Sequence, residues 1–321
     1  MKATAIAHPI QGLIKYHGLK IPRLRIPYHD SISVCIEALK TTTTVEALNV
    51  LEKNEILINE KEPVGSEKQR IETVLNELKK TAKFHGSFKI TSENNLRRGK
   101  GLGFSASGFA ALGLAACEAL GLKFDTIRLS EIVRLGAGSA TRSLVGSFAV
   151  WYADSGGRSY AEQLRSPGDV DFSMVIVPIQ SSIKTDEAHV EVLSSPLFKA
   201  RLKNIDALLE KMKTAVKRGD TATIGKLAEE DTLSLHAITM TGKSHMILWE
   251  PDTVRIVKEV TQMREEGVPA WYSMDTGPSV FVNTYRKDSG NVALRLRRLG
   301  YENVIVSGTG EQATTTENHL F

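Results

Sequence analysis

A glycine-rich segment that runs directly into an apolar helix pattern constrains this chain most. Residues 101–108 read Gly-Leu-Gly-Phe-Ser-Ala-Ser-Gly. Apolar side chains then recur at helical spacing, at Phe109, Leu112, Ala116, Ala119 and Leu120. Glycines allow close approach to the backbone, and a helix N-terminus offers free N–H groups at the positive end of its dipole. The pattern predicts a phosphate-binding loop, although its spacing matches neither a P-loop nor a dinucleotide fingerprint. The alternative is a flexible turn before a closely packed helix.

The residues around this loop fit a phosphorylated small molecule better than a nucleic acid. Ser105 and Ser107 add hydroxyls that could hold phosphate oxygens or Mg²⁺, and Arg97, Arg98 and Lys100 add positive charge. Elsewhere Lys and Arg are scattered, their 41 residues exceed the 37 Asp and Glu by only four, and aromatic residues make up 6% of the chain. Because nucleic-acid-binding surfaces cluster basic residues with aromatic ones, we expect no nucleic-acid partner.

The hydrophobic pattern predicts a mixed fold. Strands are expected around residue 6 and at 32–35, 41–45, 55–58, 88–91, 172–178, 271–283 and 303–307. Helices are expected at 67–83, from 109, from a cap at Ser130, and at 197–216, 223–240, 253–264 (capped by Asp252) and 294–299. The order of these elements predicts two α+β domains, 1–180 and 181–321. The polar tail 312–319 is expected to be mobile.

Three further segments carry residue types that are suited to chemistry. Arg142 lies in the small-residue run 136–146, where its planar fork would suit a bound carboxylate or phosphate, or an internal ion pair. Asp275 lies in Ser-Met-Asp-Thr-Gly-Pro-Ser, at 273–279, as either a turn former or a functional carboxylate. Lys15 precedes an aromatic pair and could position an anion, although an exposed surface lysine explains it equally well.

Several classes of protein are excluded by the sequence. No set of His, Cys, Asp and Glu has zinc-ligand spacing and no Gly-x-Ser-x-Gly elbow occurs, so hydrolase chemistry is unsupported. No run approaches the roughly 18 apolar residues that a membrane span needs, and residues 1–4 lead straight into a patterned segment rather than a signal peptide. We expect a cytoplasmic protein in which Cys35 and Cys117 are buried thiols.

Five segments, taken in order, resemble the GHMP kinase superfamily and, within it, the mevalonate diphosphate decarboxylase branch. They are 15–18 (KYHG), 27–34 (PYHDSISV), 101–111 (GLGFSASGFAA), 138–146 (GSATRSLVG) and 274–280 (MDTGPSV). Segments 7–12 and 27–35 look like an archaeal-type variant that acts on mevalonate 5-phosphate. The resemblance covers essentially the whole chain. It implies a two-domain GHMP kinase fold, with a ribosomal-protein-S5-like N-terminal domain and a ferredoxin-like C-terminal α/β sandwich, and also ATP, Mg²⁺ and a homodimer.

The resemblance implies roles for individual residues. Such enzymes use ATP to phosphorylate a tertiary 3-hydroxyl and then lose phosphate and CO₂ together, which leaves an alkene. Asp275 would orient or deprotonate the hydroxyl, Arg142 would hold the departing carboxylate, and Lys15 would neutralise the transferred phosphoryl group. Substrate-binding residues would be Tyr16, His17, Arg70, Ser139, Lys184 and Thr185. ATP would be held by Asn94, Lys100, Gly101, Gly103, Ser105, Ala106, Ser107 and Gly108, with Ser105 also a ligand of Mg²⁺.

Departures from the diphosphate-specific pattern favour a monophosphate substrate. That pattern has Tyr-Trp-Gly-Lys where residues 16–19 read Tyr-His-Gly-Leu, so a phosphate-binding lysine is missing at Leu19. Asp186 and Glu187 stand where the diphosphate usually binds and would repel a second phosphate. Phe104 replaces a serine in the nucleotide loop, which alters the expected ATP contacts. We expect ATP-dependent decarboxylation of mevalonate 5-phosphate to isopentenyl phosphate. The same reaction on the 5-diphosphate is the first alternative, and a small-molecule kinase without decarboxylation is the second.

Overall fold

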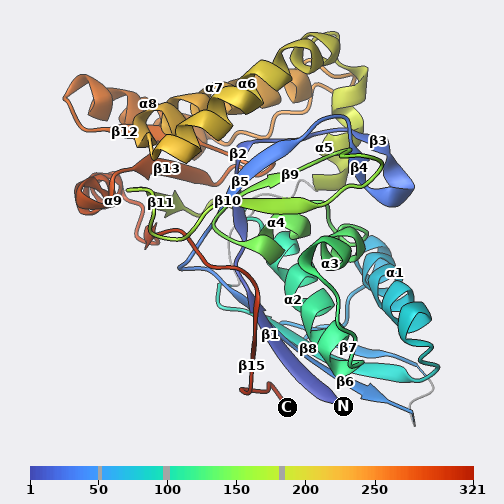
Figure 1. The fold of residues 1–321 in the computed structure, drawn as a ribbon. Helices are drawn as coiled ribbons and strands as arrows, with labels where there is room; N and C mark the ends of the chain where they lie inside the picture. Colours follow the sequence, from blue (N-terminus) through green and yellow to red (C-terminus); the bar gives the residue numbers. More distant parts are fainter. Residues whose placement is uncertain (50–52, 97–101, 181–184) are drawn as a thin grey trace.

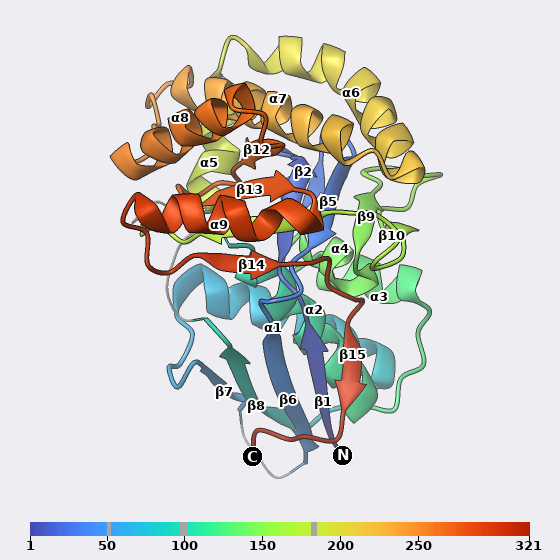
Figure 2. The ribbon, with the colours of Figure 1, turned by 90° about the vertical axis from the view of Figure 1, so that its left-hand side faces the viewer.

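The computed structural model describes residues 1–49, 53–96, 102–180 and 185–321. In Figures 1 and 2 the five-stranded sheet lies at the end that carries both chain termini, the two four-stranded sheets lie beside one another in the middle, and long helices cover the opposite end. Helices pack against sheets that are antiparallel except for one strand pair, so the fold mixes helices and sheets as the sequence predicts. The functional residues described below come from the middle sheet and the elements that pack on it.

A five-stranded sheet forms the end that carries the termini. In spatial order its strands are β15 (Thr314–Thr316), β1 (Lys2–Ala7), β6 (Thr41–Leu48), β8 (Ser87–Asn94) and β7 (Glu55–Ile58). Neighbours are antiparallel except for β7 and β8, which are parallel. One face is covered by α1 (Gly65–Ala82), α2 (Phe104–Ala119) and α3 (Thr126–Val133). The alanine-rich α2 packs closely on β1 and β6 because its side chains are small.

A four-stranded sheet occupies the middle of the molecule (Figure 1). Its order is β10 (Ala161–Arg165), β9 (Phe148–Trp151), β5 (Ser31–Cys35) and β2 (Ile10–Ile14), all antiparallel. The short helix α4 (Ala140–Val145) leads into β9. A small hairpin of β3 (Leu19–Ile21) and β4 (Ile26–Pro27), joined by the 3-10 turn η1 (Pro22–Leu24), follows β2. Strands β2, β5 and β9 are buried at every position, although β2 and β5 include polar residues and only β9 is a continuous apolar run.

The third sheet and five helices form the remaining part. The sheet order is β12 (Ala270–Ser273), β13 (Val280–Thr284), β11 (Ser173–Val177) and β14 (Ile305–Ser307), all antiparallel. The helices are α5 (Thr185–Glu191), α6 (Phe198–Arg218), α7 (Thr221–Met240), α8 (Pro251–Glu265) and α9 (Ser289–Arg298), with 3-10 turns η2 (Val192–Ser194) and η3 (Arg286–Asp288). Helix α7 packs on both β2 and β12 and so links the middle sheet to the third sheet.

Most predicted elements are present, but several boundaries were wrong. Asp125, not Ser130, caps α3, through a 2.6 Å hydrogen bond from the Arg128 main-chain N–H. Glu250, not Asp252, is the N-cap residue of α8, within a capping box. The single strand expected at 271–283 is two strands, because the loop between β12 and β13 breaks it. The polar tail is tied down, since β15 pairs with β1.

Strand β11 precedes residue 180 yet pairs with β13 and β14, which follow it. The division of the chain at residue 180 stays a prediction. Cys35 and Cys117 are free and buried, as expected. Within the described ranges, no helix combines the length and the apolar character that crossing a bilayer would require.

Candidate active site

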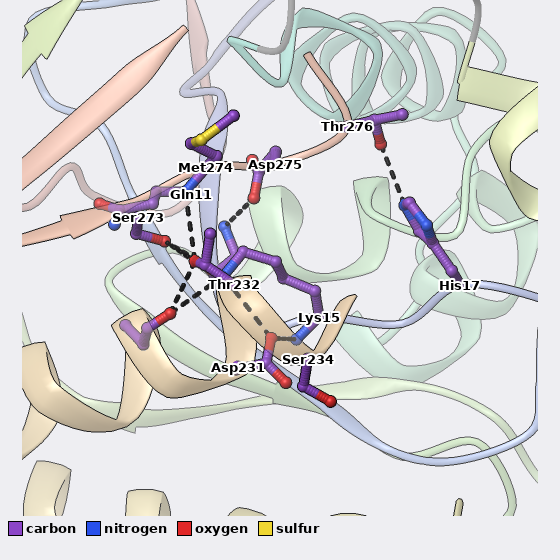
Figure 3. Close-up of polar contacts among 12 residues, drawn as sticks. Gln11, Lys15, His17, Asp231, Thr232, Ser234, Ser273, Met274, Asp275 and Thr276 are labelled. Atoms are coloured by element: carbon purple, nitrogen blue, oxygen red, sulfur yellow. Dashed lines mark hydrogen bonds and ion pairs between the residues drawn. The ribbon is translucent and has the colours of Figure 1, made fainter. Parts of the chain in front are cut away.

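Polar side chains from three distant segments meet beside the end of β2 (Figure 3). Gly12 lies in β2, and its main-chain N–H donates a 2.9 Å hydrogen bond to Oδ1 of Asp275, in the β12–β13 loop. Lys15 follows β2, and its Nζ donates to Oγ1 of Thr232, on α7, over 3.0 Å. The surface alternative for Lys15 is wrong, because only 5% of the residue is exposed. The structure therefore places two of the three predicted catalytic residues in one polar cluster.

Asp275 has an environment that suits proton transfer. Its removal from water raises the pKa of the carboxyl to about 6, against the opposing effects of Lys15, the Gly12 N–H and Arg142. A carboxyl that titrates near neutral pH can accept a proton and release it again under physiological conditions. Of the two interpretations left open by the sequence, the functional carboxylate fits this environment better than the turn former.

Lys15 is held by a second carboxylate, that of Asp231 on α7. The Lys15 main-chain N–H donates to Oδ2 of Asp231 over 2.9 Å, and Nζ lies 3.5 Å from the same oxygen. Burial lowers the pKa of Lys15, while Asp231 and Asp275 act to raise it. The ammonium thus lies between two carboxylates inside the protein.

Arg142 lies in α4 and is only 2% exposed. Its guanidinium lies over the rings of Tyr16 and Trp151, with its central carbon 5.6 and 5.8 Å from their centroids. Within the described part of the chain, Nε and Nη1 have no hydrogen-bond partner, and none of the ion pairs found there includes Arg142. The internal ion pair considered from the sequence is therefore absent there. A buried donor without a partner is costly, and this geometry leaves the planar fork available to an anionic ligand.

Aromatic rings enclose the other side of this cluster. His17 Nε2 lies 3.1 Å from Oγ1 of Thr276, next to Asp275. His189, on α5, stacks on Tyr16 with centroids 5.2 Å apart and meets the His17 ring edge-on at 5.0 Å. The Gly18 main-chain N–H donates to Nδ1 of His189 over 3.2 Å. Helix α5 is thereby attached to the segment that carries the predicted substrate-binding residues.

A separate pocket of about 140 Å³ lies between the five-stranded sheet and helices α1 and α2. Asn94, Ser105 and Gly108, all predicted to bind ATP, line it together with Arg70. Arg70 was predicted to bind the phosphorylated substrate instead. Its guanidinium lies 5.5 Å from the Phe109 ring centroid, and Nη1 donates to the Gly136 carbonyl over 3.4 Å. The structure therefore groups Arg70 with the residues predicted for the nucleotide.

The other predicted ligand-binding residues differ in their placement. Ser107 is fully buried, with its Oγ 2.7 Å from Oγ1 of Thr41, and Ala106 lies in a small apolar cluster. Gly103 has a φ of +72°, and a Cβ there would lie 2.4 Å from the Ile10 carbonyl oxygen, so only glycine fits this turn. Ser139 is half-buried at the start of α4, and Thr185 begins α5. Lys100, Gly101 and Lys184, with Arg97 and Arg98, lie outside the described residues.

Sequence reasoning missed Asp231, Thr232, Arg201 and His189. A signal for Asp231 exists in the pattern of α7, where Leu227, Ala228, Asp231 and Leu235 fall on one buried face. A carboxylate on an otherwise apolar helix face is rarely buried without a partner. The partner itself, Lys15, is 216 residues away in sequence, and only the fold brings the two together.

Two family models match successive parts of the chain. The one described as the diphosphomevalonate decarboxylase-like N-terminal domain matches residues 7–161, and the one described as the mevalonate 5-diphosphate decarboxylase C-terminal domain matches residues 181–317. The chain belongs to the mevalonate diphosphate decarboxylase family. The family expected from the five sequence segments is thereby confirmed.

Similar proteins bear two related names within this family. The phosphomevalonate decarboxylase of Haloferax volcanii is 38% identical, over 99% of this chain and 99% of its own length. The diphosphomevalonate decarboxylase of Saccharomyces cerevisiae is 30% identical, over 86% of this chain and 76% of its own length. A solved structure described as MDDEF in complex with MVAPP, AMPPCP and magnesium has a TM-score of 0.92 and 26% identity, and 99% of both chains are covered. The predicted GHMP-type fold is confirmed.

Proposed function

We propose that this protein catalyses the ATP-dependent decarboxylation of mevalonate 5-phosphate to isopentenyl phosphate, ADP, phosphate and CO₂. The observation that carries the proposal is that Asp275, a buried carboxyl whose pKa is raised to about 6, lies within electrostatic range of Arg142, a buried guanidinium whose Nε and Nη1 have no hydrogen-bond partner in the described part of the chain. One group can accept a hydroxyl proton, and the other can hold a carboxylate. The relative of the same length in Haloferax volcanii is named phosphomevalonate decarboxylase.

The chemistry explains why both groups are needed. Hydroxide is a poor leaving group, so the 3-hydroxyl is converted to a phosphate ester by the γ-phosphoryl group of ATP. Asp275 takes the proton of that hydroxyl, and Lys15 offsets the charge of the transferred phosphoryl group. The C3–O bond then breaks and its electron pair leaves with the phosphate. At the same time the bond to the carboxylate carbon breaks, CO₂ is released, and the electron pair of that bond forms the C=C bond. Arg142, aided by Tyr16 and Ser139, holds the carboxylate opposite the leaving phosphate.

ATP would occupy the pocket between the five-stranded sheet and helices α1 and α2. Its walls combine apolar side chains such as Ile56 and Phe109 with Asn94, Ser105 and Arg70, a mixture that suits a base with a polar sugar and phosphates. Gly103 precedes α2, whose first turns carry Ala106, Ser107 and Gly108, and this helix N-terminus would bind the phosphates together with Lys100 and Gly101. The described residues contain no cluster of three or more His, Cys, Asp or Glu side chains that could hold a metal. Bound Mg²⁺ would neutralise phosphate oxygens, and the exposed Ser105 hydroxyl is our candidate protein ligand.

The 5-phosphate tail would bind near Tyr16 and His17, on the side where α5 approaches, with Lys184 and Thr185 as further contacts. Leu19 is half-buried in β3 and Glu187 is exposed on α5. Leu19 supplies no cation to bind a second phosphate, and Glu187 adds a negative charge that would repel it. Both features favour a monophosphate over a diphosphate.

Two alternatives remain within the same chemistry. Decarboxylation of mevalonate 5-diphosphate is favoured by the name of the Saccharomyces cerevisiae relative. A kinase that stops at the 3-phosphorylated product would need ATP and Asp275 but would not need Arg142 to hold a departing carboxylate. We also propose that the enzyme acts as a cytoplasmic homodimer without nucleic-acid or membrane partners, as the family resemblance implies. Light scattering after gel filtration tests the dimer.

The deciding experiment is ATP-dependent CO₂ release by the purified protein, with mevalonate 5-phosphate and the 5-diphosphate assayed in parallel. Turnover of the monophosphate, with little from the diphosphate, is the expected result. Turnover of the diphosphate alone would keep the mechanism and overturn the substrate assignment. ADP formation without CO₂ from either compound would make the protein a kinase.

A further inference from the structure

Asp231 uses both of its carboxylate oxygens on charged partners in the interior. The residue has no exposed surface. Oδ2 accepts the Lys15 main-chain N–H, and Oδ1 accepts a hydrogen bond from Nη2 of Arg201, on α6, over 2.7 Å. Arg201 is itself buried, and its Nη1 donates to Oγ of Ser234 over 2.8 Å. Asp231, Arg201 and Ser234, on helices α6 and α7, are thus joined by hydrogen bonds next to Lys15.

This network holds Lys15 at several points. Its N–H bonds to Asp231, its carbonyl oxygen accepts from Nη2 of Arg201 over 2.8 Å, and its Nζ lies beside Asp231 and donates to Thr232. Lysine is ordinarily among the most flexible side chains and loses much rotamer entropy when it is fixed. Contacts to both its main chain and its ammonium fix Lys15 beside Asp231 and Thr232, and its side chain passes close to Gly12, which binds Asp275 (Figure 3).

The two carboxylates of the site differ in their bonding. Asp231 accepts from a guanidinium and a main-chain N–H, whereas Asp275 accepts from the main-chain N–H of Gly12. The charged and titratable groups that face Lys15 are Asp231 and His236 from α7, Arg201 from α6, Asp275 from the β12–β13 loop, and His17 from its own segment. Carboxylates in such different environments take different roles.

We propose that Asp231, held by Arg201, is a positioning residue that orients Lys15 and keeps it protonated for the reaction, which leaves Asp275 as the carboxyl that exchanges a proton. The proposal rests on the function proposed above, because Lys15 acts there on the transferred phosphoryl group. Neither Asp231 nor Arg201 lies within the five segments that carry the family resemblance. Their role follows from the contacts alone.

Removing the charge of Asp231 has a defined effect on pH dependence. Asp231 raises the pKa of Lys15, so Asp231→Asn lowers that pKa, and the alkaline limb of the kcat profile moves to lower pH. Asp231 also raises the pKa of Asp275, so the acid limb moves in the same direction. An opposite charge at this range shifts a pKa by roughly 1 to 3 units. A merely structural role would lower the yield of folded enzyme and leave both limbs in place.

The experiment compares Asp231→Asn and Asp231→Glu with the wild-type chain. CO₂ release from mevalonate 5-phosphate is measured from pH 5 to 10, and the reactivity of Lys15 is followed separately by trace acetylation and peptide mass spectrometry. We expect kcat of Asp231→Asn to fall by about 10²-fold and the alkaline limb to move down by about one pH unit. The acid limb should move less, in the same direction, because Asp231 is the weakest of the influences on the pKa of Asp275. Asp231→Glu keeps the negative charge, so both limbs of its kcat–pH profile should lie where they do in the wild type, while its maximal kcat stays below that of the wild type.

Glu229→Gln supplies the matched control. Glu229 lies on the same helix and forms a two-point pair with Arg264, with hydrogen bonds of 2.7 and 2.9 Å, away from Lys15. The substitution also removes one carboxylate charge from α7, and it leaves both limbs in place if the proposal holds. Equal shifts in Glu229→Gln and Asp231→Asn, or no change in the pKa at which Lys15 becomes reactive in Asp231→Asn, would overturn the proposal.

A second variant covers the case in which Asp231→Asn does not fold. Thr232→Val removes the hydroxyl that accepts from Nζ of Lys15 and from the Met274 main-chain N–H, and alters no charge. It should lower kcat about tenfold with unmoved limbs, and wild-type kcat there would overturn the orienting role. Acetylation reports on Lys15 without turnover. If the wild-type protein releases no CO₂, the proposed function is wrong, but acetylation still tests whether Asp231 raises the pKa of Lys15.

Discussion

The main-chain N–H of Gly12 donates a 2.9 Å hydrogen bond to Oδ1 of Asp275, which joins two residues that lie 263 positions apart. The contact ties β2 of the middle sheet to the β12–β13 loop of the third sheet. It is possible only because Gly12 has no side chain. A Cβ there would lie 2.8 Å from Oδ1 of Asp275 and 2.7 Å from Cγ of Lys15. Gly12 therefore sets the distance between the two groups to which we assign proton transfer and charge neutralisation.

Gly12→Ala should damage catalysis more than folding. The new methyl group meets two buried side chains that are held by hydrogen bonds, so the cost in stability is expected to be about 1–3 kcal/mol. The displaced Asp275 and Lys15 should lower kcat by about 10²-fold, since such reactions are sensitive to misplacement by an ångström. Gly290→Ala, in α9 with open space around its Cβ position, is the control and should keep full activity. Urea unfolding and CO₂ release are the measurements.

Asp275→Asn should remove turnover while leaving nucleotide binding intact. Loss of a general base typically lowers the rate by about 10² to 10⁴-fold. The nucleotide pocket is lined by residues of the five-stranded sheet and helices α1 and α2, so binding of a fluorescent ATP analogue should change little. CO₂ and ADP are measured separately in the same reactions. Activity like that of the wild-type protein would remove Asp275 from the mechanism.

The same substitution should make stability depend differently on pH. The pKa of Asp275 is raised from 3.8 to about 6 in the folded protein. Between these values the native state keeps a proton that the unfolded state has released, so wild-type stability falls as pH rises from about 4 to 6. Asp275→Asn escapes this loss and should gain on the order of 2–3 kcal/mol relative to the wild type above pH 6. A difference in unfolding free energy that is the same at pH 4 and pH 7 would contradict the raised pKa.

Much of this site could be predicted from local sequence. The glycine-rich segment before α2, Arg142 in its small-residue run and Asp275 beside a Gly-Pro break stand out because their residue types conflict with their neighbours. Such conflicts mark functional positions. The helices with strong 3.6-residue periodicity, such as α6, were also predicted within a few residues.

The remaining features depend on contacts across the fold. Arg201 reads as one of several charged residues on a long amphipathic helix, and only the packing of α6 on α7 turns it inward toward Asp231. The pairing of β15 with β1 involves polar threonines, whose pattern alone resembles a loose tail. Caps were assigned wrongly because Ser130 and Asp252 are good capping residues at which the helices do not begin. Local propensity is a weak guide where tertiary contacts decide.

Arg142→Lys tests the guanidinium fork directly. Lysine keeps the positive charge but loses the planar, two-point geometry and the stacking on Tyr16 and Trp151. We expect kcat/KM to fall, with a loss of transition-state stabilisation on the order of 2–4 kcal/mol. Most of the loss should appear in kcat. Steady-state kinetics of CO₂ release provide the measurement. Unchanged kinetics would show that Arg142 serves the fold and not the carboxylate.

His189→Ala tests whether α5 contributes to the substrate site. Because the Gly18 N–H donates to Nδ1 of His189, the neutral ring carries its proton on Nε2. Loss of the ring removes this contact and the stacking on Tyr16, so KM for mevalonate 5-phosphate should rise about tenfold, with a smaller change in kcat. Val190→Ala, at a neighbouring side chain that is 70% exposed, is the control. An unchanged KM in His189→Ala would place α5 outside the binding site.

Glu187→Gln tests the origin of substrate preference. Glu187 is exposed on α5, two residues before His189, where its charge would repel the second phosphate of the diphosphate. Removing one charge at a solvated position changes the interaction by about 1 kcal/mol. The ratio of kcat/KM for the diphosphate to that for the monophosphate should therefore rise about fivefold. Glu265→Gln, an exposed carboxylate at the end of α8, should leave the ratio unchanged. If the ratio also stays constant in Glu187→Gln, repulsion from α5 does not set the substrate preference. The missing cation at Leu19 is then the remaining explanation, and Leu19→Lys would test it.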